Sequence, residues 1–253
     1  MPEPIPEYLP DLPYDLRALT ATLVTEDDTP VDNLFSAKQR RLLVEQLYSS
    51  WQPTALEDTA KSRVFMADSG VGIFSSIYQP PIAPDMFLSL DVEPNPAYLA
   101  TEHRSYFIWE YGKAPEVAVE VVSNRKGKEM DEKLRRYSQC GIGYYVVFDP
   151  FGVLGGEAVL VHELIFGGRR YRRRPDFLLP ELHLSLQLWH GEFEGLTTQW
   201  LRWCDAAGNM ILTGAERANT EAERANTEAA ARQAAELEVE KLRAELQRLQ
   251  SKS

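Results

Sequence analysis

The sequence predicts an α/β protein whose strands form a sheet covered by helices, followed by a long C-terminal helix. Three observations support this fold class. Short β-branched runs are bounded by glycine and proline, a strand-helix-strand unit covers residues 116–150, and the composition changes abruptly beyond about residue 209. With 253 residues, 44% of them hydrophobic, the chain is long enough to bury one domain of ordinary size and to carry an appendage.

The N-terminal segment, residues 1–35, is acidic and contains many prolines. It holds eight acidic residues against the single base Arg17, a net charge of -7, and it offers little apolar surface to bury. We therefore expect an acidic arm over residues 1–35, separate from a folded domain over residues 36–209.

The folded domain is expected to begin with a helix. Leu42, Leu43, Leu47 and Trp51 recur at helical spacing, and Ser36 is the predicted N-cap. The apolar side of this helix should pack on the sheet.

Two strands follow, over residues 70–78 and 85–92. The connection "QPPIAP" separates them, because its prolines cannot donate to a strand ladder. Asp85 then stands at the beginning of the second strand.

A strand-helix-strand unit comes next. Residues 116–122 and 144–149 are expected as strands, and they flank a charged helix over residues 126–141 that ends at Gly141 and Gly143. Met130, Leu134 and Tyr137 mark the inward face of this helix. Further strands are predicted at residues 157–166, 169–174 and 182–189.

The tail, residues 210–253, is predicted to be helical. "ERANTEA" occurs twice in succession, and Val239, Leu242, Leu246 and Leu249 follow the 3-4-3 spacing of a coiled coil. A homodimer through this tail is expected; a solvated single helix is the alternative, because the alanine-rich half offers little to bury.

Charge and hydropathy exclude some classes of protein. A net charge of -11 argues against loose coating of nucleic acid, which depends on neutralising phosphates. No stretch approaches the roughly 18 apolar residues of a membrane span. The start of the sequence lacks a basic region followed by an apolar one, so we expect a cytoplasmic protein without a membrane partner.

Glu120 interrupts the apolar run "EVAVEVV", where an unpaired carboxylate would cost several kcal/mol. It shares a strand face with Ala118 and Val122, so a buried face requires a cation, and Lys133 is the nearest candidate. Asp85 supplies a second acid at the start of another strand. Two acids that converge at strand ends would form a hard oxygen site suited to Mg²⁺.

The order of these residues resembles a known family. "PD" at Pro84-Asp85, "VEVVS" at 119–123, "EKLRRY" at 132–137 and "G-x-x-YYVVFDP" are similar to the Uma-type family of proposed restriction endonucleases, within the PD-(D/E)xK nuclease superfamily. The resemblance covers roughly residues 36–204. It implies a mixed central sheet flanked by helices, the restriction-endonuclease-like fold, and it leaves the acidic arm and the tail outside.

The resemblance implies a Mg²⁺-dependent endonuclease, with Mn²⁺ as a possible substitute, that hydrolyses phosphodiester bonds in DNA. Asp85 and Glu120 would hold the metal, and Asp85, Glu120 and Lys133 would form the catalytic set. The superfamily expects a lysine two positions after the strand acid, where this chain has Val122; in Uma-type proteins the following helix supplies the lysine, which maps onto Lys133.

Each assignment has a simpler alternative. Asp85 would otherwise only cap a turn, Glu120 would face water on an edge strand, and Lys133 would form a surface bridge with Glu129. The whole chain would then be a catalytically inactive nuclease-fold protein that acts as a nucleic-acid-binding or coiled-coil assembly module.

A basic cluster is the predicted contact for DNA phosphates. Its members are Arg169, Arg170, Arg172, Arg173 and Arg174. The alternative is a solvated face.

Overall fold

The structure is a computed structural model, and it describes residues 33–54, 62–94, 96, 104–123, 132–165 and 170–250. Contacts divide the chain into two compact units, and the division falls between Ile211 and Leu212. In the described residues, no helix is long and apolar enough to cross a membrane.

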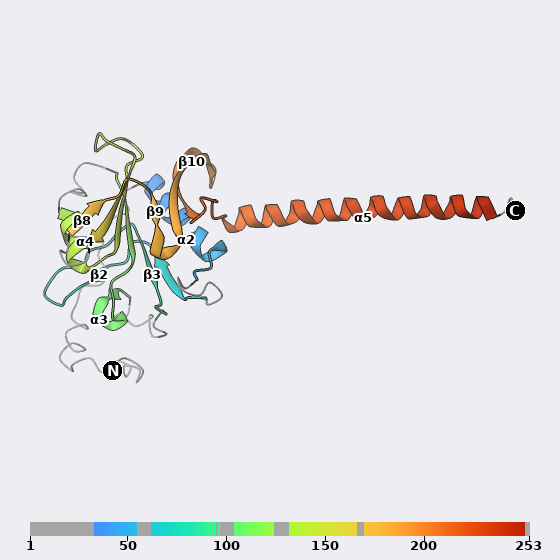
Figure 1. Cartoon of the computed structure of the whole chain (residues 1–253). Coiled ribbons are helices and arrows are strands. Elements are labelled where there is room, and N and C mark those ends of the chain that lie inside the picture. Colours follow the sequence, from blue (N-terminus) through green and yellow to red (C-terminus); the bar gives the residue numbers. More distant parts are fainter. Residues whose placement is uncertain are drawn as a thin grey trace, which may run out of the picture. The chain divides into compact units, whose positions relative to one another are not determined.

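A mixed sheet forms the centre of the first unit, as predicted (Figure 1). In the described part of the chain it has six strands, which lie side by side in the order β1 (Phe65–Asp68), β3 (Met86–Leu90), β5 (Val117–Val121), β6 (Tyr144–Phe148), β7 (Val159–Ile165) and β8 (Arg170–Arg173). Strands β5 and β6 are parallel, as the strand-helix-strand unit requires, and the other neighbours are antiparallel.

Smaller elements surround this sheet. A long hairpin of β10 (Leu184–Phe193) and β11 (Leu196–Asp205) pairs with the short β9 (Leu178–Leu179), and a parallel pair joins β2 (Ile73–Phe74) to β4 (Tyr106–Phe107). The described helices of this unit are α2 (Leu34–Ser50), α3 (Ile108–Tyr111), α4 (Leu134–Cys140) and the 3₁₀ turn η4 (Pro180–Leu182).

Helix α2 docks on strand β11 through two buried glutamines. Gln39 makes two bonds with Leu201, from Nε2 to the carbonyl at 2.8 Å and from the Leu201 N–H to Oε1 at 3.0 Å. Gln46 bonds the Trp203 N–H and the Ile211 carbonyl in the same way. The bonds to Leu201 and Trp203 satisfy backbone groups at the edge of β11.

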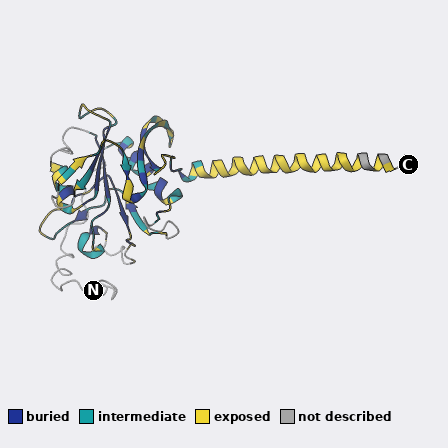
Figure 2. Ribbon diagram, in the orientation of Figure 1, coloured by how far each residue is buried: buried dark blue, intermediate teal, exposed yellow. Residues whose placement is uncertain are grey.

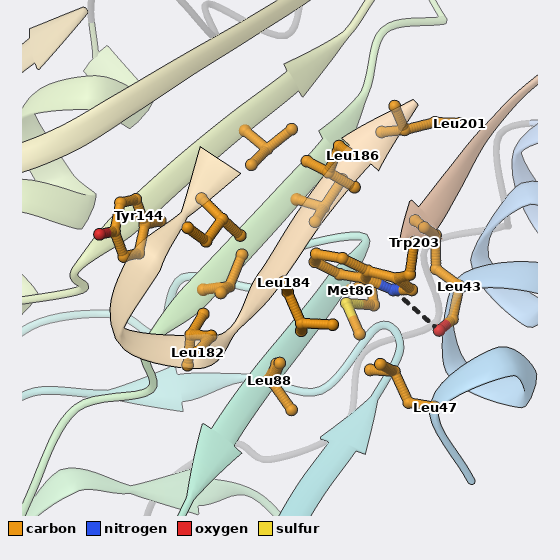
Figure 3. Close-up of a cluster of buried hydrophobic side chains, with 14 of the residues drawn as sticks. Leu43, Leu47, Met86, Leu88, Tyr144, Leu182, Leu184, Leu186, Leu201 and Trp203 are labelled. Carbon is orange, nitrogen blue, oxygen red and sulfur yellow. Dashed lines mark hydrogen bonds between the residues drawn. The ribbon is translucent and has the colours of Figure 1, made fainter. Parts of the chain in front are cut away.

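The main core lies between one face of the central sheet, helix α2 and the β9–β11 sheet (Figure 3). Leu43 and Leu47 of α2 meet Met86 and Leu88 of β3, all of them fully buried. Trp203 fills the space between these layers, and its indole N–H donates to the Leu43 carbonyl at 3.1 Å.

The opposite face of the sheet carries a second core, which helix α4 covers. Ala118, Val122 and Tyr145 lie in it together with Tyr137 of α4. Figure 2 shows the buried strands between these two layers. The face of β5 that carries Glu120 is therefore buried, and the edge-strand alternative for this residue is wrong because β5 is an interior strand.

Several predicted boundaries differ from the structure. The N-cap of α2 is Asn33 and not Ser36, because the Asn33 side chain accepts the Ser36 N–H at 2.8 Å and the helix begins earlier. The strand predicted at 70–78 is reduced to the two residues of β2. Residues 126–131 of the predicted helix, with Met130 and Glu129, lie outside the described residues; its end at Cys140 and Gly141 is confirmed.

The second unit contains α5 (Gly214–Gln250), a helix of 37 residues. Thr213 and Glu216 form a capping box at its start: the Glu216 N–H donates to Thr213 Oγ1 at 3.2 Å, and the Thr213 N–H donates to Glu216 Oε2 at 2.8 Å. Beyond the first turn, every side chain that the structure describes on α5 is exposed (Figure 2).

Candidate active site

Asp85 lies directly before β3 and points to the side of the sheet that α4 covers. Its Oδ2 accepts the backbone N–H of Val121 at 2.7 Å, so the neighbouring strand β5 fixes the carboxylate. Only 9% of the residue is exposed. The hydrogen bond joins the start of β3 to the end of β5, where Glu120 is the adjacent residue.

Glu120 is 3% exposed and meets two donors, one from the N-cap residue of helix α4 and one from the helix itself. Lys133 Nζ lies 2.8 Å from Oε2, and the Tyr137 hydroxyl donates to Oε1 at 2.5 Å. Lys133 and Tyr137 are four residues apart, so they project from the same side of the helix. Lys133 is thus the cation that the strand environment of Glu120 required, and it offsets part of the cost of burial.

The environment disfavours the charged form of both acids. Burial raises the pKa of Glu120 to about 7; the charge of Asp85 acts in the same direction, and that of Lys133 opposes both. Burial also raises the pKa of Asp85, against the Val121 N–H and the charges of Arg40 and Lys133. Each carboxyl group affects the pKa of the other, which shows that the two acids form one cluster.

Arg40 is a member of this cluster that the sequence did not reveal. Its NH1 lies 3.1 Å from Asp85 Oδ1, and its side chain is 16% exposed. Arg40 comes from α2, which covers the other face of the sheet, and reaches round to Asp85. In the sequence nothing distinguishes it from Arg41 beside it. Tyr137 was predicted only as an inward-facing residue, although its spacing from Lys133 was a signal that both reach the same target.

Val122 occupies the position where the superfamily pattern places a lysine. It is fully buried in the second core, and its N–H donates to the Phe148 carbonyl at 2.7 Å. A lysine side chain there would have to hold its charge among apolar neighbours, which costs several kcal/mol. Lys133, the N-cap residue of α4, reaches Glu120 instead, with 27% of its side chain exposed.

The arginine cluster is not part of the acid cluster. Arg169 lies outside the described residues, and the others lie on or next to β8, three strands from Glu120 and so roughly 14 Å across the sheet. Arg172 and Arg174 both pair with Glu163, and Arg173 pairs with Glu157. Nearby acids therefore offset much of the positive charge of this cluster.

The donor set has the chemistry of a small divalent-cation site. Asp85 and Glu120 offer hard carboxylate oxygens, which Mg²⁺ and Mn²⁺ prefer. Across the described ranges no group of three His, Cys, Asp or Glu side chains is placed to hold a metal. A bound ion would accordingly keep several positions for water or for substrate oxygens, as Mg²⁺ usually does.

The fold and the cluster define an α/β protein with a buried pair of acids at the ends of neighbouring strands. Residues 28–199, more than half of the chain, match the family model Uma2, which carries the description "Putative restriction endonuclease". The chain belongs to this family, as the motifs indicated. Neither the curated proteins nor the solved structures gave a match.

Proposed function

We propose that the protein is a metal-dependent endonuclease that hydrolyses phosphodiester bonds in DNA. The observation that carries the proposal is the convergence of Asp85 and Glu120 on one face of the sheet, with Lys133 on Glu120, in a chain of the Uma2 family. Burying a pair of acids lowers the stability of a fold, so such pairs are typical of functional sites.

In this proposal Asp85 and Glu120 hold Mg²⁺ or Mn²⁺. The ion supplies a Lewis acid for the phosphoryl oxygen and lowers the pKa of a bound water. The Val121 N–H orients Asp85, and the Tyr137 hydroxyl orients Glu120, so both carboxylates keep their positions when substrate arrives. Lys133 is near enough to solvent to orient the attacking water or to offset negative charge on the phosphate.

Nicking of supercoiled plasmid with Mg²⁺ or Mn²⁺ tests this proposal. Glu120→Gln should lower the rate at least about a hundredfold, because it removes one of two charged ligands. The matched control is Glu192→Gln, an exposed glutamate on β10. Equal activity of wild type and Glu120→Gln would overturn the assignment.

A second candidate function is supported by the charge balance of the cluster. Arg40 and Lys133 already neutralise both acids, which is also what an inactive nuclease-fold scaffold would need. Such a protein would act as a nucleic-acid-binding or assembly module. Calorimetry with Mn²⁺ separates the two: the active site binds the ion and loses it on Asp85→Asn, whereas the scaffold binds none.

We also propose that the described arginines on and next to β8, namely Arg170, Arg172, Arg173 and Arg174, contact DNA phosphates. Arg170 and Arg173 are the strongest members, because they are exposed and do not share Glu163. Replacing both by alanine should weaken DNA binding equally on all sequences. The slope of the logarithm of the binding constant against the logarithm of the salt concentration should become shallower by about one to two units. An unchanged slope, measured by fluorescence anisotropy, would leave the cluster as a solvated face.

The cytoplasmic location remains a prediction.

A further inference from the structure

Arg40 binds Asp85 in a manner that differs from two other arginine–carboxylate pairs of the first unit, Arg63–Asp91 and Arg41–Glu194. Arg63 places Nε and NH2 against both oxygens of Asp91, at 2.6 to 3.2 Å. Arg41 does the same with Glu194, at 2.5 and 3.0 Å. Both are two-pronged pairs, the geometry that fixes a guanidinium most firmly.

Arg40 makes a single contact instead. In the described part of the chain, the bond from NH1 to Asp85 Oδ1 is the one hydrogen bond of its guanidinium, although the group has five N–H donors. The side chain is nevertheless only 16% exposed. Within the described residues, most N–H donors of this largely buried cation are therefore not used in hydrogen bonds, although the group lies beside an acid of the proposed metal site.

Asp85 does not depend on Arg40 for its orientation. The Val121 N–H already holds Oδ2 at 2.7 Å, so the carboxylate stays aligned with strand β5 when the arginine leaves. What Arg40 supplies is positive charge on Oδ1, the oxygen that the backbone leaves available. A metal ion on Asp85 would require the same oxygen or its immediate surroundings.

We propose that Arg40 is an exchangeable cation that leaves Asp85 when the divalent metal binds and then contacts a phosphate oxygen of the DNA strand. The inference rests on the proposed endonuclease function and adds a residue from helix α2 to it. A phosphate fits the planar fork of the guanidinium, whose donors exceed what Asp85 uses. The exchange also explains how a site that is neutral without metal becomes positive when DNA must be bound.

Calorimetry with Mn²⁺ alone tests the first half of the exchange. Removing a positive charge 3.1 Å from Asp85 Oδ1 should tighten Mn²⁺ binding by at least about threefold in Arg40→Gln. Arg40→Lys, which keeps the charge, should remain near the wild-type affinity. The matched control is Arg41→Gln, on the same helix but paired with Glu194, and it should leave the affinity unchanged.

Binding of a short DNA duplex tests the second half, with Ca²⁺ as the divalent ion. Arg40→Gln should weaken binding about fivefold when Ca²⁺ is present and hardly at all when the ion is removed by a chelator. Weaker or equal Mn²⁺ binding by Arg40→Gln would overturn the exchange and make Arg40 a fixed clamp of Asp85. If the wild-type protein itself bound no Mn²⁺, the proposed endonuclease function would fail, and the exchange with it.

Discussion

The carboxyl group of Glu120 lies on an interior strand, and its negative charge is costly for that reason. Its pKa of about 7 is higher in the folded chain than the ordinary value of 4.5. The protonated form is therefore the better fit to the fold. The contribution of Glu120 to the free energy of unfolding is fully present below the pKa that the group has in the unfolded chain. It is lost as the pH rises through the pKa that the group has in the folded chain.

We predict that Glu120→Gln removes this pH dependence. Between about pH 4.5 and pH 7 the wild type should lose up to about 3 kcal/mol of unfolding free energy relative to the variant, because the amide never ionises. Urea unfolding from pH 5 to pH 8, with divalent ions chelated, measures the difference. Glu192→Gln, on an exposed surface, should follow the wild type. Parallel curves for Glu120→Gln and wild type would contradict the prediction.

Single residues of the cluster were predictable to different degrees. Glu120 stood out because an acid interrupts an apolar run, and Lys133 followed because the buried charge needs a cation within reach. Arg40 gave no such signal. It lies on the polar flank of an amphipathic helix, where arginine is ordinary, and only the packing of α2 brings it to Asp85.

Elements were predictable where the local pattern agrees with the final packing. Strands β5 and β6 lie within the predicted ranges because both are buried on two faces and read as continuous apolar runs. Strand β11 was missed. Its sequence, "LTTQWLRWCD", mixes polar and charged residues with tryptophans, and its partners α2 and β10 supply the burial that defines it.

The β10–β11 hairpin offers a test of packing at the scale of one element. Trp189 leans over Gly191 on the same face of β10, and Arg202 lies 4.7 Å from the centre of the Trp189 ring. A Cβ on Gly191 would fall 1.9 Å from the nearest ring atom, so the ring would have to move. The Gly191 carbonyl also accepts the Trp200 indole N–H at 3.1 Å.

Gly191→Ala should lower the free energy of unfolding by about 1 to 3 kcal/mol, because the displaced ring loses its contact with Arg202. Denaturant unfolding followed by tryptophan fluorescence measures the loss. Gly156→Ala is the control, since a Cβ there has no atom within 4 Å. Equal changes in the two variants would show that the position of Trp189 does not determine the effect.

The two units of the chain differ in what they can bury. The first unit buries two apolar cores, and Ile211 belongs to the main one: this residue is 8% exposed, and its carbonyl accepts a hydrogen bond from Arg202 at 2.9 Å. Helix α5 cannot do so alone. Its 37 residues extend for about 56 Å, and Val239 and Leu242 are 46% and 52% exposed.

A second copy of the chain is the simplest partner for this apolar stripe. Val239, Leu242, Leu246 and Leu249 have coiled-coil spacing in the sequence, although the last two side chains lie outside those described. Residues 210–253 carry eight acidic and seven basic residues, a net charge of -1, so charge repulsion does not oppose pairing. For the proposed endonuclease, a dimer would bring two cutting sites to one duplex, which gives such a helix a geometric use.

We predict a concentration-dependent dimer in analytical ultracentrifugation, reduced to monomer when the chain is truncated after Ile211. Truncation at this point keeps Ile211, which packs in the main core. Leu242→Glu should also give the monomer, because it places a charge in the apolar stripe. Leu237→Glu should not, since Leu237 is 60% exposed and falls outside the 3-4-3 spacing. A full-length protein that stays monomeric at tens of micromolar would instead make α5 a lone helix or a docking site for another protein.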